Sequence, residues 1–232
     1  LGFNLLAINS TPLTGIQPLE SENYIMMFNG EIYNTKYLIE KFNLIYDQSD
    51  TALLFELLNK INLEICDFIE GIYSIFIYDK RNNTINLLRD NFGSKPFYYS
   101  QKGNKFYFSS FLKNLVKIKT AVIDNLSLEN YLSYGYNFGE NTFFSDIKSV
   151  PTDKILKFDL TNNQLYFEDK NNKRKNQKKL DFEKVIIQSF DVLTKDQGLL
   201  LSGGIDSNII LELLNKYNYK PKIFSTRFDK AG

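Results

Sequence analysis

Apolar and polar positions in the first 168 residues follow two different periods. Apolar residues at helical spacing predict four helices, over 35–42, 50–58, 111–118 and 127–134. Short and nearly continuous apolar runs predict strands over 24–28, 71–78, 84–88, 96–100, 105–109, 154–159 and 164–168. Because these runs carry few polar positions, we expect a sheet that is covered on both faces. The pattern as a whole indicates an α+β fold.

Polar residues mark where these elements begin and end. Hairpin turns are expected at 80–83, 102–104 and 161–163. Ser49 is a suitable N-cap for the helix that starts at Asp50. The strand over 24–28 is expected to end in a polar turn at Asn29-Gly30-Glu31, since Asn-Gly is a strong turn signal.

A polar segment divides the chain. Residues 169–179 contain no apolar side chain, which predicts a solvated linker. A basic run can also contact nucleic acid, but no aromatic residues are interleaved here for base stacking. Further elements are expected as a helix over 182–193, a strand over 198–201, a helix over 207–216 and a strand over 222–226. This order is typical of a parallel α/β domain. We therefore predict two domains, 1–168 and 169–232.

Composition narrows the class of protein. The 232 residues are 43% hydrophobic and 15% aromatic, which excludes a disordered chain. The formal net charge is +1, so no global field attracts nucleic acid or an anionic membrane. No apolar run is long enough for a transmembrane helix and no signal peptide is visible, so we expect a cytoplasmic protein that acts on small molecules.

Two residue types restrict the chemistry. Histidine is absent, which removes Ser-His-Asp and Cys-His catalysis and every histidine-ligated zinc site. Cys66 is the single cysteine, so no disulfide can form within the chain. It lies in an apolar stretch without an adjacent free amine, which favours a buried, inert thiol.

The sharpest local signal follows the strand that contains Leu200. We expect a buried strand to deliver a serine, two glycines and an aspartate to the start of a helix, where backbone N–H groups and the helix dipole favour an anion. The residues expected to bind phosphate are Leu200, Ser202, Gly203, Gly204, Asp206 and Ser207. Asp206 is also the candidate ligand for the Mg²⁺ that accompanies pyrophosphate. The alternative is a glycine turn in which Asp206 only caps the helix, but the complete hexapeptide favours phosphate.

A second candidate site follows the strand over 24–28. Asn29 and Gly30 place an amide side chain and a backbone N–H where they could stabilise an oxyanion. Glu31 and Asp50 could hold a substrate ammonium. From the turn alone, a plain Asn-Gly turn with two surface acids is the better interpretation.

The order of several motifs outweighs that interpretation. These are Gly15 with Gln17-Pro18, Asn29–Asn34, Ser49-Asp50-Thr51, Glu70-Gly71, Arg89-Asp90-Asn91-Phe92-Gly93, Lys95–Tyr99 and Ser202–Ser207. The last of them resembles the signature of the ATP pyrophosphatase (PP-loop) family. Together, along essentially the whole chain, they resemble glutamine-dependent asparagine synthetase.

The resemblance implies an N-terminal-nucleophile glutaminase domain, an αββα sandwich, followed by the start of an ATP-binding synthetase domain. It implies that Asn29 and Gly30 form the oxyanion hole, and that Glu31 and Asp50 hold the α-amine of glutamine. Ammonia would then attack a β-aspartyl-adenylate to give asparagine, AMP and pyrophosphate. The implied ligands are glutamine, aspartate, ATP and Mg²⁺; no nucleic acid or membrane partner is implied, and a homodimer stays open.

Two features depart from that pattern. The family nucleophile is an N-terminal cysteine, whereas this sequence starts at Leu1 in a strand-like run, so we expect a piece of a longer protein that is inactive alone. Leu5 stands at the usual position of an arginine that binds the glutamine carboxylate. Two alternatives therefore remain: a paralogue that amidates another carboxylate, and a catalytically silent relative that only binds ligand.

Overall fold

The chain forms two compact units, Leu1–Lys173 and Arg174–Gly232. The computed structural model describes residues 2, 16–45, 49–118, 121–170, 182–190 and 198–226. Leu1, Leu5, Gly15 and most of the expected linker lie outside the described residues.

Two antiparallel sheets make up the first unit. The larger sheet has the strand order β1-β2-β3-β4-β8-β9 and the smaller has the order β6-β5-β7. In the larger sheet the strands are β1 (Leu19–Glu20), β2 (Tyr24–Ile32), β3 (Gly71–Asp79), β4 (Thr84–Arg89), β8 (Lys154–Asp159) and β9 (Gln164–Asp169). In the smaller sheet they are β5 (Tyr98–Lys102), β6 (Lys105–Ser109) and β7 (Lys148–Ser149). The three expected hairpins, β3–β4, β5–β6 and β8–β9, are confirmed.

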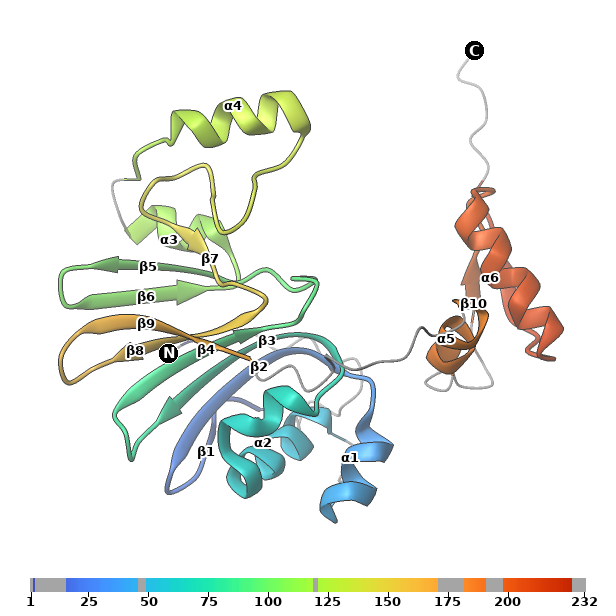
Figure 1. The fold of residues 1–232 in the computed structure, drawn as a ribbon, viewed down its shortest axis with the longest axis horizontal. Helices are drawn as coiled ribbons and strands as arrows, with labels where there is room; N and C mark the ends of the chain where they lie inside the picture. The colour runs from blue at the N-terminus through green and yellow to red at the C-terminus, as the bar shows by residue number, and fades with distance from the viewer. Residues whose placement is uncertain are drawn as a thin grey trace. The chain divides into compact units, whose positions relative to one another are not determined.

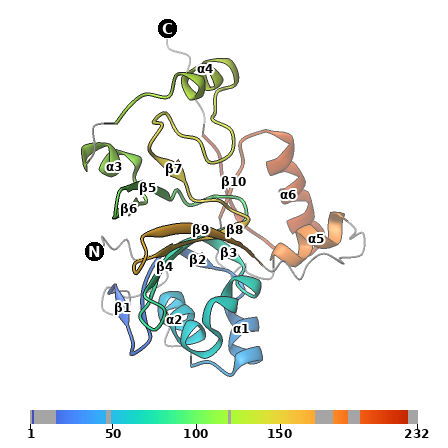
Figure 2. The same cartoon turned by 60° about the vertical axis from the view of Figure 1, so that its left-hand side comes forward.

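Helices cover the outer faces of both sheets (Figures 1 and 2). On the large sheet lie α1 (Thr35–Phe42), α2 (Asp50–Ile61) and the 3₁₀-helix η1 (Asn62–Asp67). Beyond the small sheet lie α3 (Leu112–Ile118) and α4 (Asn125–Tyr134). The layer order is thus helix, sheet, sheet, helix, as the expected αββα sandwich requires. No helix in the described part of the chain is long and apolar enough to cross a bilayer.

Two interfaces between layers each have their own apolar core. Alternate residues of β2, including Met26 and Phe28, face α2 and pack against leucines such as Leu54 that are fully buried. The opposite residues of the large sheet face the small sheet, where Phe106 stacks on Phe158 with ring centroids 4.6 Å apart. Both faces of the large sheet are therefore buried, which explains the continuous apolarity of its central strands.

Strand β2 continues through the segment that was expected to be a turn. Asn29-Gly30-Glu31 pairs with β3 up to Ile32, which lies opposite Gly71. The turn prediction was therefore wrong. The Asn-Gly signal is local, whereas nine consecutive residues of β2 find partners in β3.

The second unit begins as a parallel α/β structure. Strand β10 (Gly198–Leu200) pairs in parallel with β11 (Lys222–Phe224), and α6 (Ile205–Lys216) connects them. Helix α5 (Phe182–Ser189) precedes β10 and is tied to α6 by an ion pair between Glu183 and Lys216 at 2.6 Å. The expected connection of strand, helix and parallel strand is confirmed.

Two glycines let β2 and β3 approach closely near their shared end, which yields a prediction. A Cβ on Gly71 would lie 2.0 Å from the carbonyl oxygen of Glu31. We expect Gly71→Ala to lower the free energy of unfolding by about 3 kcal/mol, because backbone on both strands would have to move. Denaturant titration measures this value. Gly103→Ala is the control: its φ of +58° disfavours a side chain, but nothing lies within 4 Å of the added Cβ, so about 1 kcal/mol is expected, and equal losses would contradict the prediction.

Candidate functional site

The end of β2 presents backbone groups outward in a fixed alternation. Tyr73 lies opposite Gly30 on β3. Its N–H donates to the Asp90 carboxylate and its C=O accepts the backbone N–H of Asp90, so Gly30 and Tyr73 form a non-hydrogen-bonded pair. The N–H groups of Phe28, Gly30 and Ile32 therefore point away from β3. That of Phe28 donates to Gln17 Oε1 at 2.6 Å, while Gln17 Nε2 donates back to the Phe28 carbonyl at 2.9 Å.

The outward N–H of Gly30 is the one left available. Ile32 donates its N–H to Asp50 Oδ2 at 3.3 Å, just as Phe28 donates to Gln17. Between them, the Gly30 N–H has no acceptor among the residues that the structure describes. The neighbouring Asn29 side chain is exposed. Both groups assigned to an oxyanion hole are therefore accessible at this strand end.

Asp50 is a buried carboxylate at the first position of α2. Ser49 caps that helix by accepting a hydrogen bond from the Ala52 N–H at 3.3 Å, as predicted. Burial raises the pKa of Asp50, and the nearby Glu31 carboxylate raises it further against the lowering effect of backbone donors such as the Ile32 N–H. Within the described part of the chain, neither Asp50 nor Glu31 forms an ion pair. Among the described residues, the structure thus brings two like charges together without a cation.

Two further residues of the Asn29–Asn34 motif complete this edge. Asn34 donates from Nδ2 to the Phe68 carbonyl at 2.8 Å and accepts from the Glu70 N–H at 2.9 Å. This bridge fixes the loop before β3. Burial raises the pKa of the Tyr33 hydroxyl, and Glu31 and Asp90 add to the shift, so these acids share one neighbourhood.

The turn after β4 is organised around one carboxylate, Asp90, which is 1% exposed. It accepts the N–H groups of Tyr73 at 3.2 Å, Phe92 at 3.1 Å, Ser94 at 3.0 Å and Lys95 at 3.1 Å. Burial alone would raise the pKa of Asp90, but these four donors together lower it. Asp90 therefore holds the turn and the middle of β3 in one arrangement.

Gly93 and Arg89 close the same turn. Arg89 donates from Nη2 to the Gly93 carbonyl at 2.6 Å and from Nε to the Lys95 carbonyl at 2.7 Å. Gly93 has a φ of +64°, and a Cβ there would meet Arg89 Cζ at 3.0 Å and Thr152 Cγ2 at 3.2 Å. The Arg-Asp-x-x-Gly spacing is thus explained by packing within the turn.

Lys170 does not belong to a solvated linker, contrary to the expectation for 169–179. Asp169 ends β9, and Lys170 is only 7% exposed. Its Nζ donates to the carbonyls of Arg89 and Thr152. A lysine can bury its ammonium where carbonyl oxygens converge, which composition alone does not reveal. The remaining linker residues lie outside the described part.

The second candidate site is the loop between β10 and α6. Gly203 has a φ of +80° and Gly204 is the N-cap of α6, without a side-chain cap. Ser202 Oγ and Ser207 Oγ lie 3.2 Å apart, and Asp206 is exposed in the first helical turn. Asp206 is therefore not the cap of the helix.

Leu200 was expected in a buried strand, but it is 80% exposed. Local apolarity predicted its burial. Burial requires a covering layer, and β10 has only β11 as a strand neighbour in the described part of this unit.

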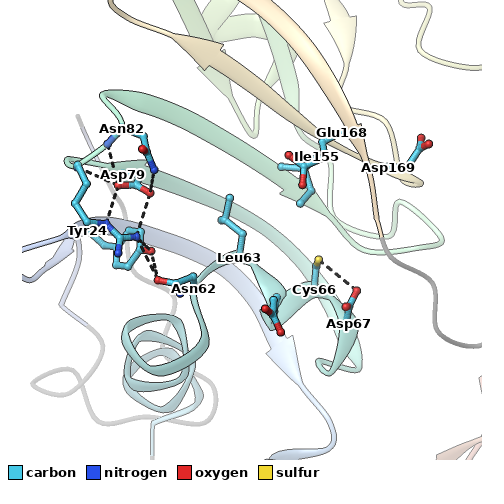
Figure 3. A pocket seen from close by; sticks show the side chains of 12 residues that line it. Tyr24, Asn62, Leu63, Cys66, Asp67, Asp79, Asn82, Ile155, Glu168 and Asp169 are labelled. Atoms are coloured by element: carbon cyan, nitrogen blue, oxygen red, sulfur yellow. Dashed lines mark hydrogen bonds and ion pairs between the residues drawn. The ribbon is translucent and has the colours of Figure 1, made fainter.

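A polar cavity of about 440 Å³ opens elsewhere in the first unit (Figure 3). It lies beside η1 and the strands β3, β8 and β9, and none of the expected glutamine-site residues lines it. Cys66 is among its lining residues, half-buried rather than buried as expected. Burial, followed by the Asp67 carboxylate, raises the pKa of the Cys66 thiol to about 11. The thiol is therefore protonated at neutral pH and a poor nucleophile.

Comparison with known proteins assigns the family. The family described as "Glutamine amidotransferase domain" matches residues 1–168. The chain belongs to the glutamine amidotransferase domain family. Its large sheet, its small sheet and the candidate site at the end of β2 all fall within this match.

Curated relatives of this amidotransferase domain extend the likeness beyond residue 168. A putative glutamine-hydrolysing asparagine synthetase 2 of Methanocaldococcus jannaschii is 30% identical over 91% of this chain and 44% of its own length. A glutamine-hydrolysing asparagine synthetase 1 of Bacillus subtilis is 28% identical over 100% of this chain and 39% of its own length. The chain thus spans less than half of these relatives. Among solved structures, a glutamine phosphoribosylpyrophosphate amidotransferase of B. subtilis matches with a TM-score of 0.45 and 16% identity, over 70% of this chain and 33% of its own.

Gln17, Asn34 and Asp90 belong to the motifs named above, but no role was predicted for them. Their place in polar motifs beside strand ends could have predicted a structural role, since such side chains often form hydrogen bonds with backbone groups. Lys170 gave no comparable signal, because it stands in a run of similar polar residues.

The Asp90 turn yields a prediction about pH. The folded-state pKa of Asp90 is lowered, so its contribution to stability is present above the unfolded-state pKa of about 3.9 and is lost as pH falls through the folded value. Asp90→Asn should therefore lower the free energy of unfolding at pH 7 by about 2–3 kcal/mol, and the difference from wild type should narrow below pH 4. Denaturant titrations at several pH values measure both effects.

Asp159→Asn is the matched control, because Asp159 accepts turn N–H groups from Thr161 and Asn162 at an exposed site. We expect a change of less than about 0.5 kcal/mol there. A pH-independent loss in Asp90→Asn would contradict the linkage.

Proposed function

We propose that the end of β2 binds glutamine, with Glu31 and Asp50 holding its α-ammonium group. The observation that carries this proposal is the pair of adjacent carboxylates, one of them buried, without an ion-pair partner among the described residues. Such an arrangement costs free energy unless a cation arrives. An amino-acid ammonium supplies that charge and three donors.

The oxyanion hole is proposed to consist of the Asn29 side-chain amide and the Gly30 N–H. A developing oxyanion is stabilised by donors that are already oriented before the reaction. Support comes from the alternation along β2, which directs the Gly30 N–H outward, between two N–H groups that Gln17 and Asp50 accept.

The complete reaction is proposed from the family and the relatives. A thiolate, which the resemblance assigns to a residue outside this sequence, would attack the glutamine amide and release ammonia. The ammonia would attack a β-aspartyl-adenylate formed with ATP, giving asparagine, AMP and pyrophosphate. The names of the relatives favour aspartate over another carboxylate as acceptor. We further propose that the parent protein acts in the cytoplasm and forms a homodimer.

ATP is proposed to place its phosphates on the loop before α6, against Leu200, Ser202, Gly203, Gly204, Asp206 and Ser207. The residues fit this group: the loop is exposed, the first N–H groups of α6 lack intrahelical partners, and space around Gly203 is open to at least 4 Å. Asp206 offers the single carboxylate that Mg²⁺ commonly takes besides phosphate oxygens. The ion would neutralise the phosphate charge there.

The glutamine site is tested with Asp50→Asn. We expect affinity for glutamine to fall at least tenfold, because a charge-assisted hydrogen bond is lost. Because the folded-state pKa of Asp50 is raised, its ionised form costs stability at pH 7, so this variant should unfold at no lower denaturant concentration than wild type. Titration calorimetry and denaturant unfolding measure the two effects.

Glu40→Gln, an exposed acid on α1, is the control and should leave both values unchanged. If Asp50→Asn destabilises the fold and keeps its affinity for glutamine, Asp50 is structural and the proposal fails.

The phosphate loop is tested with Asp206→Asn and Mg²⁺–pyrophosphate as the probe. We expect about a tenfold loss of affinity, since the variant keeps the shape but loses the charge that holds the ion. Glu212→Gln removes another exposed acid farther along α6 and should bind like wild type. Equal affinity of the two variants, measured by calorimetry, would refute the role of Asp206.

A further inference from the structure

A buried ammonium group lies where β9 ends. Lys170 Nζ donates to the Thr152 carbonyl at 2.6 Å and to the Arg89 carbonyl. The backbone N–H of Lys170 donates to the Asp153 carbonyl at 3.1 Å. One residue thus joins the end of β4, the loop before β8 and the C-terminal end of β9.

Arg89 is connected to the proposed glutamine site through the residue that follows it. The next residue, Asp90, exchanges hydrogen bonds with Tyr73, accepting its N–H at 3.2 Å and donating to its carbonyl at 2.9 Å. Tyr73 lies opposite Gly30 in the strand register. Lys170 Nζ also lies 6.0 Å from the centroid of the Tyr73 ring. A continuous series of contacts through Arg89, Asp90 and Tyr73 therefore connects Lys170 to Gly30.

The second contact reaches the other side of the same turn. Thr152, whose carbonyl Lys170 binds, has its Cγ2 3.2 Å from where a Cβ of Gly93 would lie. The ammonium therefore holds both the start of the turn and the loop that packs against it.

A contribution to folding stability does not explain why a lysine is buried here. Burial lowers the pKa of Lys170 to about 8, and the facing groups Cys66, Asp90 and Asp153 offset only part of that shift. The charged form thus costs stability below pH 8, and that cost is relieved as pH rises toward the unfolded value of about 10.4. A buried lysine whose charge lowers the stability of the fold is best explained by the groups that it positions.

We propose that Lys170 is a positioning residue of the glutamine site, which ties the C-terminal end of β9 to the Asp90 turn and thereby holds Tyr73 in place opposite Gly30. This inference rests on the proposed function. It adds that glutamine affinity depends on a residue at the C-terminal end of β9, without any contact between Lys170 and glutamine.

The experiment compares Lys170→Met, Lys170→Arg and Lys80→Met in the complete chain. Lys80 is the matched control: its Nζ binds the Ser21 carbonyl at 2.8 Å and Glu20 at 2.5 Å, near the opposite end of β2 and β3. Hydrogen exchange of the N–H groups of Tyr73, Ser94 and Lys95 is expected to speed up at least tenfold in Lys170→Met, but not in Lys80→Met. Unchanged exchange in Lys170→Met would overturn the proposal.

Glutamine affinity is the second readout. We expect it to weaken about tenfold in Lys170→Met, to recover largely in Lys170→Arg, and to stay at the wild-type value in Lys80→Met. Wild-type affinity in Lys170→Met would overturn the positioning role. If the wild-type chain binds no glutamine, the proposed function fails, whereas the exchange rates still decide whether Lys170 holds the turn.

A titration of the wild-type chain requires no variant that could misfold. The N–H resonances of Ser94 and Lys95 should shift with a midpoint near pH 8, the pKa of Lys170, and this step should vanish in Lys170→Met. The Cys66 thiol, with a pKa of about 11, does not titrate in this range. Resonances that stay constant between pH 7 and 9 would show that the ammonium is not coupled to the turn, contrary to the proposal.

Discussion

The antiparallel pairing of β2 with β3 is the interaction on which the first unit depends. Nine residue pairs join the two strands, and both faces of the sheet they belong to are covered. Buried backbone groups have no water to bond, so the ladder must satisfy them. Gly30 and Gly71 permit the closest approach near one end of this pair, which is where the candidate site lies. The same constraint that builds the core therefore places the site.

Two buried carboxylates near that end, Asp90 and Asp50, differ in how completely the protein satisfies their charge. Asp90 receives four backbone N–H groups, which lower its pKa, so its charge stabilises the turn. Asp50 is bonded less completely and lies near Glu31, so its pKa is raised. The protein satisfies the charge of Asp90, whereas the charge of Asp50 is the one proposed to be satisfied by a ligand. This contrast is the physical basis for assigning Asp50, and not Asp90, to binding.

The proposed phosphate loop depends on much less of the chain. A strand, two glycines and the beginning of α6 suffice to expose backbone N–H groups to an anion. Its geometry is local, because Ser202, Gly204 and Ser207 bond one another within a few residues. That is why six consecutive residues carried a usable signal, whereas the glutamine site draws on residues from β2 and α2.

The sequence alone determined the elements whose causes are local. Helix α1 spans the predicted Thr35–Phe42, Ser49 caps α2, and the three hairpins turn where polar residues interrupt apolar runs. The family resemblance also identified Glu31 and Asp50 as candidate site residues, although no local sequence pattern relates those two residues. Only the tertiary structure decided that Asn29-Gly30-Glu31 is strand and that Lys170 is buried. In both cases the deciding hydrogen bonds come from residues distant in sequence, on β3 for the strand and on β4 and the loop before β8 for Lys170. Such partners override local propensity once a buried ladder or ammonium must be satisfied.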